Sequence, residues 1–517
     1  MANKQIPVIQ ISKQSLPLAR RLSEDFSYLW AASDVGEIIP KQPVFKDGQW
    51  NPAFRRAVTL IDGTCPWLTE LGKLAHVPAN RIFYNEDDSY PSDAMHILEL
   101  KGAFPFSFAD IDVLATNINH YFFNEMFTYK LNINEIVLDA NFTGTVRQVG
   151  NYKREIAGDF GDEWVPLASY QSVIWMPRVT GFKVSVECQT TGSLEVMAKV
   201  VTFTGIGSDL AGVYQASGDE LISGVNVDVA DQPRGAQLSL YVRGSGTAEL
   251  GTAHFRRSRG PYGEPLVGAH AIVDEGSIHG QLRYYFDAGD LKPPLNVYFS
   301  GWQSAEIFEG SGMMGRMNAP HILFMDTRLE GGSFYLGSHQ LEQQVLTVIT
   351  DTLKGLGFTS NQLVLSGLSM GTYAAMYYGA SLAPHAVILG KPLTNLGTIA
   401  KAVRLQRPND FATSLDMVLA NEGGVTTQDL KRMDDRFWRV FKQGDWTKTT
   451  FVFSYMRNDD YDPTGFTKTR SFLKERFPNT RVWSKGFVGR HNDETHSIVV
   501  YFLNRYYHIL RNDFGRG

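Results

Sequence analysis

Residues 362–378, Gln-Leu-Val-Leu-Ser-Gly-Leu-Ser-Met-Gly-Thr-Tyr-Ala-Ala-Met-Tyr-Tyr, decide the fold of the second half of this chain. A β-rich run leads into Gly367-Leu-Ser369-Met-Gly371, and a run of helix formers follows. The pattern G-x-S-x-G needs its glycines because the chain turns so sharply from strand to helix that a flanking side chain would clash. We therefore predict an α/β-hydrolase-type domain whose nucleophile is Ser369, at a helix N-terminus that favours negative charge.

Apolar strands alternate with helical patterns on both sides of this motif, from about Pro294 to Gly517. Such alternation predicts a parallel sheet with crossover helices. An amphipathic helix is expected over 340–356, and the last helix over about 494–510. Residues 404–446 are inserted between strands, so we expect helices there that cap the site.

A serine hydroxyl needs a base to take its proton, and in this fold the order along the chain is nucleophile, acid, histidine. The histidines downstream of Ser369 are His385, His491, His496 and His508. We favour His491, because it lies in a loop between the last strand and the last helix. His496, one turn into that helix, is the alternative.

The acid should follow the penultimate strand, which we place at Phe451–Tyr455. Asp459 lies at the usual distance beyond the strand end and is our choice to orient the imidazole. Asp460 and Asp462 in the same loop are the alternatives.

An oxyanion hole needs two backbone N–H donors. One is expected from Met370, and the other from the Gly301-Trp302 loop that follows an earlier strand. Trp302 could also stack on a sugar or cover the site, and core packing is an equal alternative.

No metal-ligand set and no dinucleotide fingerprint is found, so neither a metal nor a tightly bound cofactor is expected.

The first half of the chain divides into two further regions. Residues 1–164 mix short apolar runs with helix-like stretches and predict an N-terminal α/β region. Residues 165–293 are rich in Val, Thr, Ser and Gly and alternate with period two, which predicts an antiparallel β-sandwich, a candidate for carbohydrate or partner binding. The expected architecture is therefore α/β, with the catalytic domain over 294–517.

Composition excludes several classes of protein. The 517 residues carry a formal net charge of −5 without a basic surplus, so a nucleic-acid partner is not expected. We interpret the basic stretch His254–Arg259 as a solvated strand end. Cys65 and Cys188 make no disulfide framework. No apolar run suits a signal peptide or a spanning helix, so a cytoplasmic location with at most peripheral membrane contact is expected.

Four blocks in order resemble a known family: Leu363–Thr372, Pro384–Leu393, Tyr455–Asp462 and Gly489–Asp493. Together they are similar to the second accessory secretory protein of the accessory Sec system of Gram-positive bacteria. The resemblance implies a serine-dependent O-acetyltransferase that modifies N-acetylglucosamine on serine-rich-repeat adhesin glycoproteins before export. It implies as partners the first and third accessory secretory proteins, the accessory SecA motor and the glycosylated adhesin.

Carried over by motif, the resemblance implies Ser369 as nucleophile, Asp459 as acid and His491 as base. Two other functions fit the same residues. A carbohydrate esterase would use the same triad to remove acetyl groups, and a scaffold of the export complex would use the domain mainly for binding. The acetyl donor and the sugar hydroxyl that is modified are open at this point.

Overall fold

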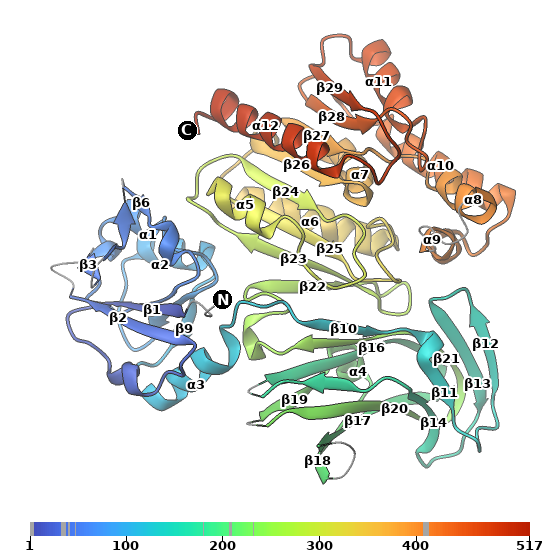
Figure 1. Ribbon diagram of the computed structural model, residues 1–517, viewed down its shortest axis with the longest axis horizontal. Coiled ribbons are helices and arrows are strands. Elements are labelled where there is room, and N and C mark those ends of the chain that lie inside the picture. The colour runs from blue at the N-terminus through green and yellow to red at the C-terminus, as the bar shows by residue number, and fades with distance from the viewer. Residues whose placement is uncertain are drawn as a thin grey trace.

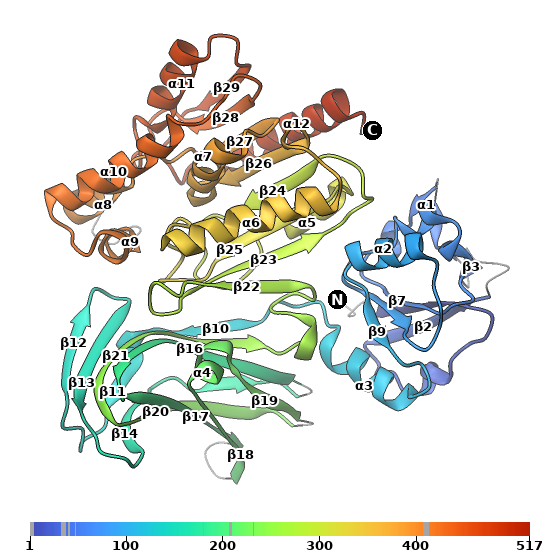
Figure 2. The ribbon, with the colours of Figure 1, turned by 180° about the vertical axis from the view of Figure 1, so that it is seen from behind.

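The computed structural model is mixed α/β, as the sequence predicts, and describes residues 5–32, 38–39, 42–46, 48–178, 180–205, 209–230, 232–406 and 413–516. It contains an N-terminal α/β unit, a β-sandwich and a large mixed sheet covered by helices (Figure 1). The edge strand β22 of the large sheet lies next to the sandwich, beside its strand β10 (Figures 1 and 2). The N-terminal unit lies to one side of both.

The N-terminal unit is a five-stranded sheet in which every strand pair is parallel. In spatial order its strands are β2 (Phe26–Ala31), β1 (Ile6–Ile11), β7 (Val58–Ile61), β8 (Ile82–Asn85) and β9 (Phe104–Phe106). Its helices are α1 (Leu71–Leu74), α2 (Ser92–Leu100) and α3 (Ile111–Tyr121), and two short ribbons pair β3 (Ile38–Ile39) with β4 (Gln42–Pro43) and β5 (Phe45–Lys46) with β6 (Gln49–Trp50).

The β-sandwich packs two antiparallel sheets face to face. One sheet contains β12 (Thr145–Val149), β13 (Lys153–Asp159), β21 (Ser245–Arg257), β16 (Thr180–Gly192) and β19 (Val225–Ala230), with β10 (Thr128–Leu131) also paired to β21. The other contains β11 (Ile136–Leu138), β14 (Val165–Tyr170), β20 (Arg234–Arg243), β17 (Glu195–Thr204) and β18 (Asp209–Ser217), with β15 (Ile174–Met176) paired to β20. The short helix α4 (Asp219–Ser223) contacts β16 of the first sheet and β17 and β18 of the second.

The large sheet has eight strands: β22 and β23 pair antiparallel at one edge, β23 pairs antiparallel with β25, and the six strands β24 to β29 run parallel to one another. Its order is β22 (Ala269–Val273), β23 (Gln281–Asp287), β25 (His321–Asp326), β24 (Leu295–Phe299), β26 (Leu363–Leu368), β27 (Ala386–Gly390), β28 (Thr450–Met456) and β29 (Val482–Phe487). One face is covered by α6 (His339–Gly355), α7 (Met370–Leu382), α8 (Leu396–Gln406), α9 (Thr413–Glu422), α10 (Thr427–Phe441) and α11 (Gly465–Arg476). The other is covered by α5 (Ser311–Met317) and α12 (Thr495–Phe514).

The expected boundaries at 165 and 294 are both wrong. The sandwich begins at β10, because strands β10 to β13 complete its sheets although their apolar alternation is weak. Strands β22 and β23 alternate like sandwich strands, but they pair with each other and β23 pairs with β25, so both belong to the large sheet. Residues 269–293 therefore belong with the large sheet rather than with the sandwich.

The basic stretch His254–Arg259 is not a solvated strand end, because its principal side chains are buried. His254, Arg256 and Arg259 are each at most 1% exposed. His254 and Arg256 lie on β21 and Arg259 lies two residues beyond its end, and each finds carboxylate or carbonyl acceptors. The predicted alternation holds for β16, whose Val184 and Val186 point into the sandwich core, but its polar face is also covered.

Among the described helices, none is both long enough and apolar enough to cross a bilayer. Cys65 and Cys188 are both buried and unpaired.

Arg259 joins the N-terminal unit to the sandwich. Its guanidinium donates to the carbonyls of Pro265 (2.7 Å), Tyr121 (3.0 Å), Phe123 (2.9 Å) and Glu125 (3.0 Å). Three of these carbonyls belong to the segment that leaves α3. Burial, together with neighbouring arginines, lowers the pKa of Arg259 well below its usual value, so its hydrogen bonds are needed to hold the charge.

We expect Arg259→Met to destabilise the protein by about 3 kcal/mol or more, because four carbonyls, two of them in buried hydrogen bonds, lose their donor. Urea unfolding measures the change. Arg243→Met is the matched control, since Arg243 pairs with Glu195 at the surface and should contribute at most about 1 kcal/mol. Equal losses in the two variants would contradict the role assigned to Arg259.

Candidate active site

Ser369 lies in a strand–turn–helix at the centre of the large sheet. It follows β26, precedes α7, and has φ +50° and ψ −116°, a backbone conformation that a serine rarely adopts. The flanking glycines are required, as predicted: a Cβ at Gly367 would lie 2.4 Å from the carbonyl carbon of Gly371, and one at Gly371 would lie 1.9 Å from the oxygen of Phe299. The turn therefore holds the hydroxyl above the sheet edge at a cost in backbone strain.

A hydrogen-bonded relay runs from this hydroxyl to a buried carboxylate. Ser369 Oγ lies 2.9 Å from His491 Nε2, and His491 Nδ1 lies 2.8 Å from Asp459 Oδ2. His491 is 1% exposed. The carboxylate fixes the proton on Nδ1 and leaves Nε2 free to accept the serine proton.

The three aspartates of the 459–462 loop have different partners. Asp459 contacts the imidazole, and its other oxygen accepts the backbone N–H groups of Tyr461 (2.9 Å) and Asp462 (3.1 Å). Asp460 accepts the backbone N–H of His491 at 2.9 Å. Asp462 accepts from the side chains and N–H groups of Thr394 and Asn395. Only Asp459 of these three is placed to orient the ring.

The pKa of Asp459 is lowered below its usual value. Burial raises it, but the hydrogen bond to His491 and the charge of that ring lower it, and the two backbone N–H groups add to the decrease. Asp459 therefore remains ionised at neutral pH, as an acid that stabilises an imidazolium must.

Tyr461 is a site residue that the sequence analysis missed. Its ring stacks on the His491 imidazole, with centroids 4.2 Å apart and planes 5° apart. Its hydroxyl accepts from Asn492 at 3.1 Å. The stack holds the imidazole in plane from one face, and only its position two residues after Asp459 could have indicated this.

The alternative histidines lie elsewhere. His496 is exposed in the first turn of α12. His385 contacts Asp513 at 2.8 Å, and His508 packs edge-on against Trp483. The structure brings none of these three rings to Ser369.

One expected oxyanion donor is already engaged. The N–H of Gly301 donates to the Glu309 carboxylate at 2.6 Å, and a carboxylate competes strongly for such a donor. Assigning Gly301 to the oxyanion hole is therefore incompatible with this geometry. Met370 opens α7, where helix geometry leaves its N–H without an intrahelical acceptor, and Trp302 follows Gly301 at the pocket.

A pocket of about 550 Å³ opens over the serine. Its lining includes Trp302, Glu309, Glu330, Ser369, Lys391 and His491. Trp302 is 37% exposed, so it faces the pocket rather than a core. Helix α10 packs on α7, and α8 and α9 pack on α10. None of these three helices lines the catalytic pocket, so the expectation that residues 404–446 cap the site is wrong for the described residues, which leave out 407–412.

Lys391 is a second residue that the sequence analysis missed. It follows β27 with φ +57°, lines the pocket and donates from Nζ to Thr495 Oγ1 at 2.8 Å. Burial lowers its pKa, and Asp459 and Asp493 oppose the decrease. Lys391 lines the same pocket as the carboxylates of Glu309 and Glu330.

The sandwich holds the two loops that flank this pocket. Lys130 of β10 donates to the carbonyls of Leu329 (3.1 Å) and Glu330 (3.2 Å). Arg256 and His254 of β21 bind the carboxylate of Glu306, which lies in the loop after β24. Both loops therefore depend on contacts from outside the large sheet.

Among the described residues, no three His, Cys, Asp or Glu side chains converge in a way that could hold a metal ion.

The chain resembles several known proteins over most of its length. The sequence profile of the accessory Sec system GspB-transporter family matches residues 53–516. An accessory Sec system protein of Staphylococcus aureus is 39% identical over 416 residues, which are 80% of this chain and 78% of the relative. One of Streptococcus gordonii is 35% identical over 405 residues, 78% of each chain.

A solved structure shares the whole fold. The Glycosylation Associate Protein (Gap123) complex from Streptococcus agalactiae contains a chain that is 31% identical, with a TM-score of 0.86 and 99% of both chains covered.

Because the relay should activate Ser369, we expect a fluorophosphonate probe to label that serine in the intact protein. His491→Ala and Asp459→Asn should slow labelling by about 10³- to 10⁴-fold. Asp460→Asn is the matched control and should change the rate little, since Asp460 accepts the backbone N–H of His491 whereas Asp459 contacts the ring. Intact-mass measurement over time gives the rates. A larger effect of Asp460→Asn than of Asp459→Asn would overturn the assignment.

The depressed pKa of Asp459 also sets a pH dependence of stability. Its folded pKa lies below its unfolded value, so its contribution is present above pH 3.8 and is lost as pH falls through the lower, folded value. The difference in unfolding free energy between wild type and Asp459→Asn should accordingly be constant near neutral pH and shrink in acid. Urea titrations from pH 7 to pH 3 measure it, and a difference that grows in acid would have the wrong sign.

Proposed function

This chain belongs to the accessory Sec system GspB-transporter family, and from that premise we propose that it is a serine-dependent O-acetyltransferase that modifies N-acetylglucosamine on serine-rich-repeat adhesin glycoproteins and supports their export. The observation that carries the catalytic part is the relay of Ser369, His491 and Asp459 beneath a pocket of about 550 Å³. In fold terms the catalytic half is an α/β-hydrolase-type domain that spans β22 to α12.

The first half-reaction makes an acyl-enzyme. His491 Nε2 takes the proton of Ser369 Oγ, and that oxygen bonds to the carbonyl carbon of the acetyl donor. The tetrahedral oxyanion accepts hydrogen bonds from the backbone N–H groups of Met370 and Trp302. When the intermediate collapses, the bond to the leaving group breaks, and the leaving group departs with the proton from His491.

The second half-reaction transfers the acetyl group to a sugar. A sugar hydroxyl gives its proton to His491 Nε2, its oxygen bonds to the acetyl carbon, and the bond to Ser369 Oγ breaks. Ser369 Oγ then recovers the proton from His491, which restores the starting state of the relay. Transfer requires that the sugar reach the acyl-enzyme more readily than water does.

The pocket suits a sugar acceptor. The Trp302 ring is partly exposed at its wall, and aromatic faces stack on sugar rings. The carboxylates of Glu309 and Glu330 and the ammonium of Lys391 offer acceptors and a donor for hydroxyl and acetamide groups. The same triad with water as acceptor would make a carbohydrate esterase, which is the second catalytic candidate.

We further propose that the protein works in the cytoplasm, with peripheral membrane contact, beside the first and third accessory secretory proteins, the accessory SecA motor and the glycosylated adhesin. Support for the accessory-protein partners is the likeness to a chain of the Gap123 complex. No tightly bound cofactor is proposed, and the acetyl donor is left unnamed. In the non-enzymatic alternative, the catalytic half serves as a scaffold of the export complex.

The deciding experiment is the intact mass of adhesin glycopeptides from cells that carry wild-type protein, Ser369→Ala or His496→Ala. Loss of acetyl groups in Ser369→Ala alone supports the transferase, since Oγ is the proposed acyl carrier. His496→Ala is the control because His496 is exposed and apart from the relay. A more acetylated glycan in Ser369→Ala would indicate an esterase. An unchanged mass would contradict both enzymatic functions and favour the scaffold alternative.

A further inference from the structure

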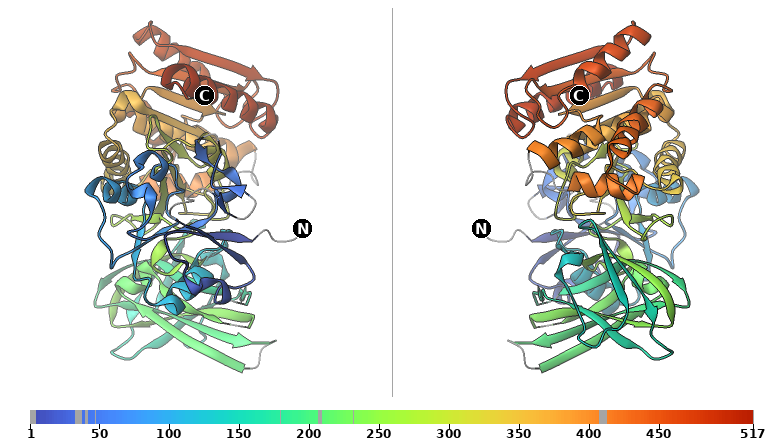
Figure 3. Two further views of the ribbon diagram at one scale, coloured as in Figure 1. Left: turned by 90° about the vertical axis from the view of Figure 1, so that its left-hand side faces the viewer. Right: turned by 90° about the vertical axis from the view of Figure 1, so that its right-hand side faces the viewer.

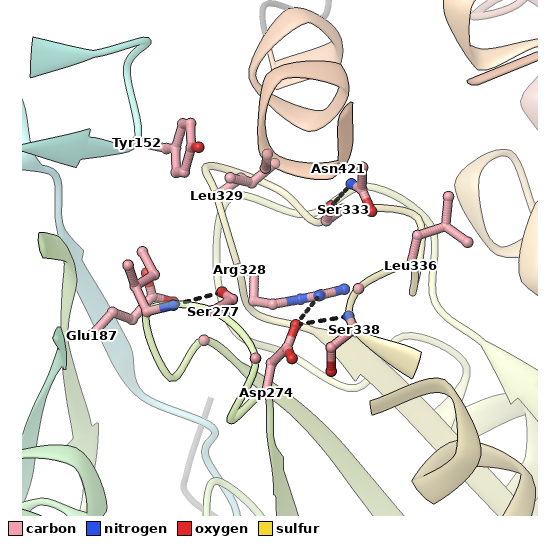
Figure 4. A pocket seen from close by; sticks show the side chains of 15 residues that line it. Tyr152, Glu187, Asp274, Ser277, Arg328, Leu329, Ser333, Leu336, Ser338 and Asn421 are labelled. Atoms are coloured by element: carbon pink, nitrogen blue, oxygen red, sulfur yellow. Dashed lines mark hydrogen bonds and ion pairs between the residues drawn. The ribbon is translucent and has the colours of Figure 1, made fainter. Parts of the chain in front are cut away.

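A second pocket lies between the sandwich and the catalytic half. It has a volume of about 240 Å³ and is lined from four places: the sandwich (Tyr152, Glu187), the β22–β23 turn (Asp274, Ser277, Ile278), the loop after β25 (Arg328, Leu329, Ser333, Leu336, Ser338) and α9 (Asn421). Figure 4 shows these side chains around one cavity, with α9 above it and Asp274 below. We call this the interdomain pocket. Its lining shares no residue with that of the catalytic pocket.

Asp274, which lines this pocket, carries an unpaired carboxylate oxygen. Asp274 is 1% exposed, and its Oδ2 accepts the N–H of Ser338 at 3.3 Å and lies 3.7 Å from Arg328 Nη1. Its Oδ1 is buried and has no hydrogen-bond partner among the described residues. An unsatisfied buried acceptor is costly, and a ligand that donates a hydrogen bond would remove that cost.

The positive charge in the pocket is already neutralised. Arg328 donates from Nε to Asp326 Oδ1 at 2.9 Å and from Nη2 to Asp326 Oδ2 at 2.8 Å, in a bidentate pair. Burial opposes the charge, but Asp326 raises the pKa of Arg328 above its usual value. With Arg328 committed and the carboxylates of Glu187 and Asp274 in the wall, an anionic ligand would be repelled.

The remaining wall offers both donors and apolar faces. The hydroxyls of Ser277, Ser333 and Ser338 line the pocket, and Asn421 Nδ2 already donates to Ser333 Oγ at 3.1 Å. Leu329 and Leu336 provide apolar surface, and the half-buried ring of Tyr152 forms the sandwich side. A simple cation would use the carboxylates but not the hydroxyls, the leucines or the aromatic ring.

We propose that the interdomain pocket binds one neutral pyranose sugar, through a sugar hydroxyl that donates to Asp274 Oδ1 and a ring face that packs on Tyr152. Its volume lies below the roughly 300 Å³ at which pockets for drug-sized ligands begin, which suits a single sugar ring. This proposal goes beyond the proposed acetyl transfer, because the interdomain pocket does not include Ser369 and the sugar is bound there without any bond being made or broken.

The site and the catalytic pocket share one segment. Leu329 lines the interdomain pocket, Glu330 lines the catalytic pocket, and Lys130 holds the carbonyls of both. A sugar in the interdomain pocket therefore contacts the segment that forms one wall of the active site.

Each pocket contains one isoleucine that can report on it separately. Ile278 lines the interdomain pocket and Ile498 the catalytic pocket. In full-length protein with labelled isoleucine methyl groups, we expect glucose and N-acetylglucosamine, titrated separately, to shift the Ile278 resonance saturably. Sorbitol, an open-chain polyol, should not. Shifts at Ile498 report the proposed acceptor site, so failure of one proposal is distinguishable from failure of the other.

Asp274→Asn tests the unpaired oxygen. Ser338 and Arg328 keep an oxygen at the Oδ2 position, so the amide nitrogen replaces Oδ1 and an acceptor becomes a donor. We expect binding at Ile278 to weaken at least tenfold, with no change in Ser369→Ala. Tyr152→Ala should weaken it and Tyr152→Phe should restore it, which keeps the proposal testable if Asp274→Asn fails to fold.

Three results would overturn the proposal: no saturable shift at Ile278 with either sugar, equal shifts with sorbitol, or unchanged affinity in both Asp274→Asn and Tyr152→Ala. A shift at Ile278 with methylammonium but with neither sugar would also overturn it, and would make the pocket a cation site.

Discussion

The buried carboxylate of Glu306 is the interaction on which the catalytic half of this molecule depends. Its side chain is fully buried, and it is held by Arg256 and His254 of strand β21. Burial raises the pKa of Glu306, but these two partners lower it well below its usual value, so the group is an ion inside the protein. Such an ion is tolerated only when both partners stay in place, and losing one typically costs about 3–5 kcal/mol.

This requirement explains why the sandwich and the large sheet form one unit. Glu306 belongs to the loop after β24, and Lys130 holds the loop after β25, so the sandwich fixes both loops that flank Ser369. The polar face of β16 and β21 is covered for the same reason: His254 and Arg256 meet Glu306 from the catalytic half instead of water, and His254 also meets Glu187 of β16. Figure 3 shows the sandwich directly beneath the sheet in both side views. The active site is therefore built from the large sheet and positioned by the sandwich.

The sequence could predict the parts of the site that local geometry dictates. Ser369 follows from glycines that the strand-to-helix turn requires, and His491 follows from its place before the last helix. The choice of Asp459 among three neighbouring aspartates depends on which carboxylate the folded loop turns toward the imidazole, and spacing leaves that open. The sequence could not give the roles of three other residues, because each role depends on a contact made only in the folded site. These are the contacts of Gly301 with Glu309, of Tyr461 with His491 and of Lys391 with Thr495.

The fold class could be predicted for a similar reason, whereas the boundaries could not. Alternating strands and helices indicate a parallel sheet, but β22 and β23 are antiparallel strands whose membership is decided by pairing with a strand further along the chain. The stretch His254–Arg259 was predicted to be solvated because charged residues usually are. Its burial depends on acceptors more than forty residues away in sequence, such as Glu306.

The order of the relay along the chain has a consequence for biosynthesis. Ser369 leaves the ribosome first, Asp459 next and His491 last of the three, and the imidazole is fixed only when α12 docks. That docking includes hydrogen bonds from Tyr506 to Asn296 (3.2 Å) and to Ser366 (3.4 Å), beneath the nucleophile strand. A nascent chain therefore carries Ser369 without its histidine partner, and any chain cut before His491 lacks the relay, so the site is assembled only when the fold of this half is complete.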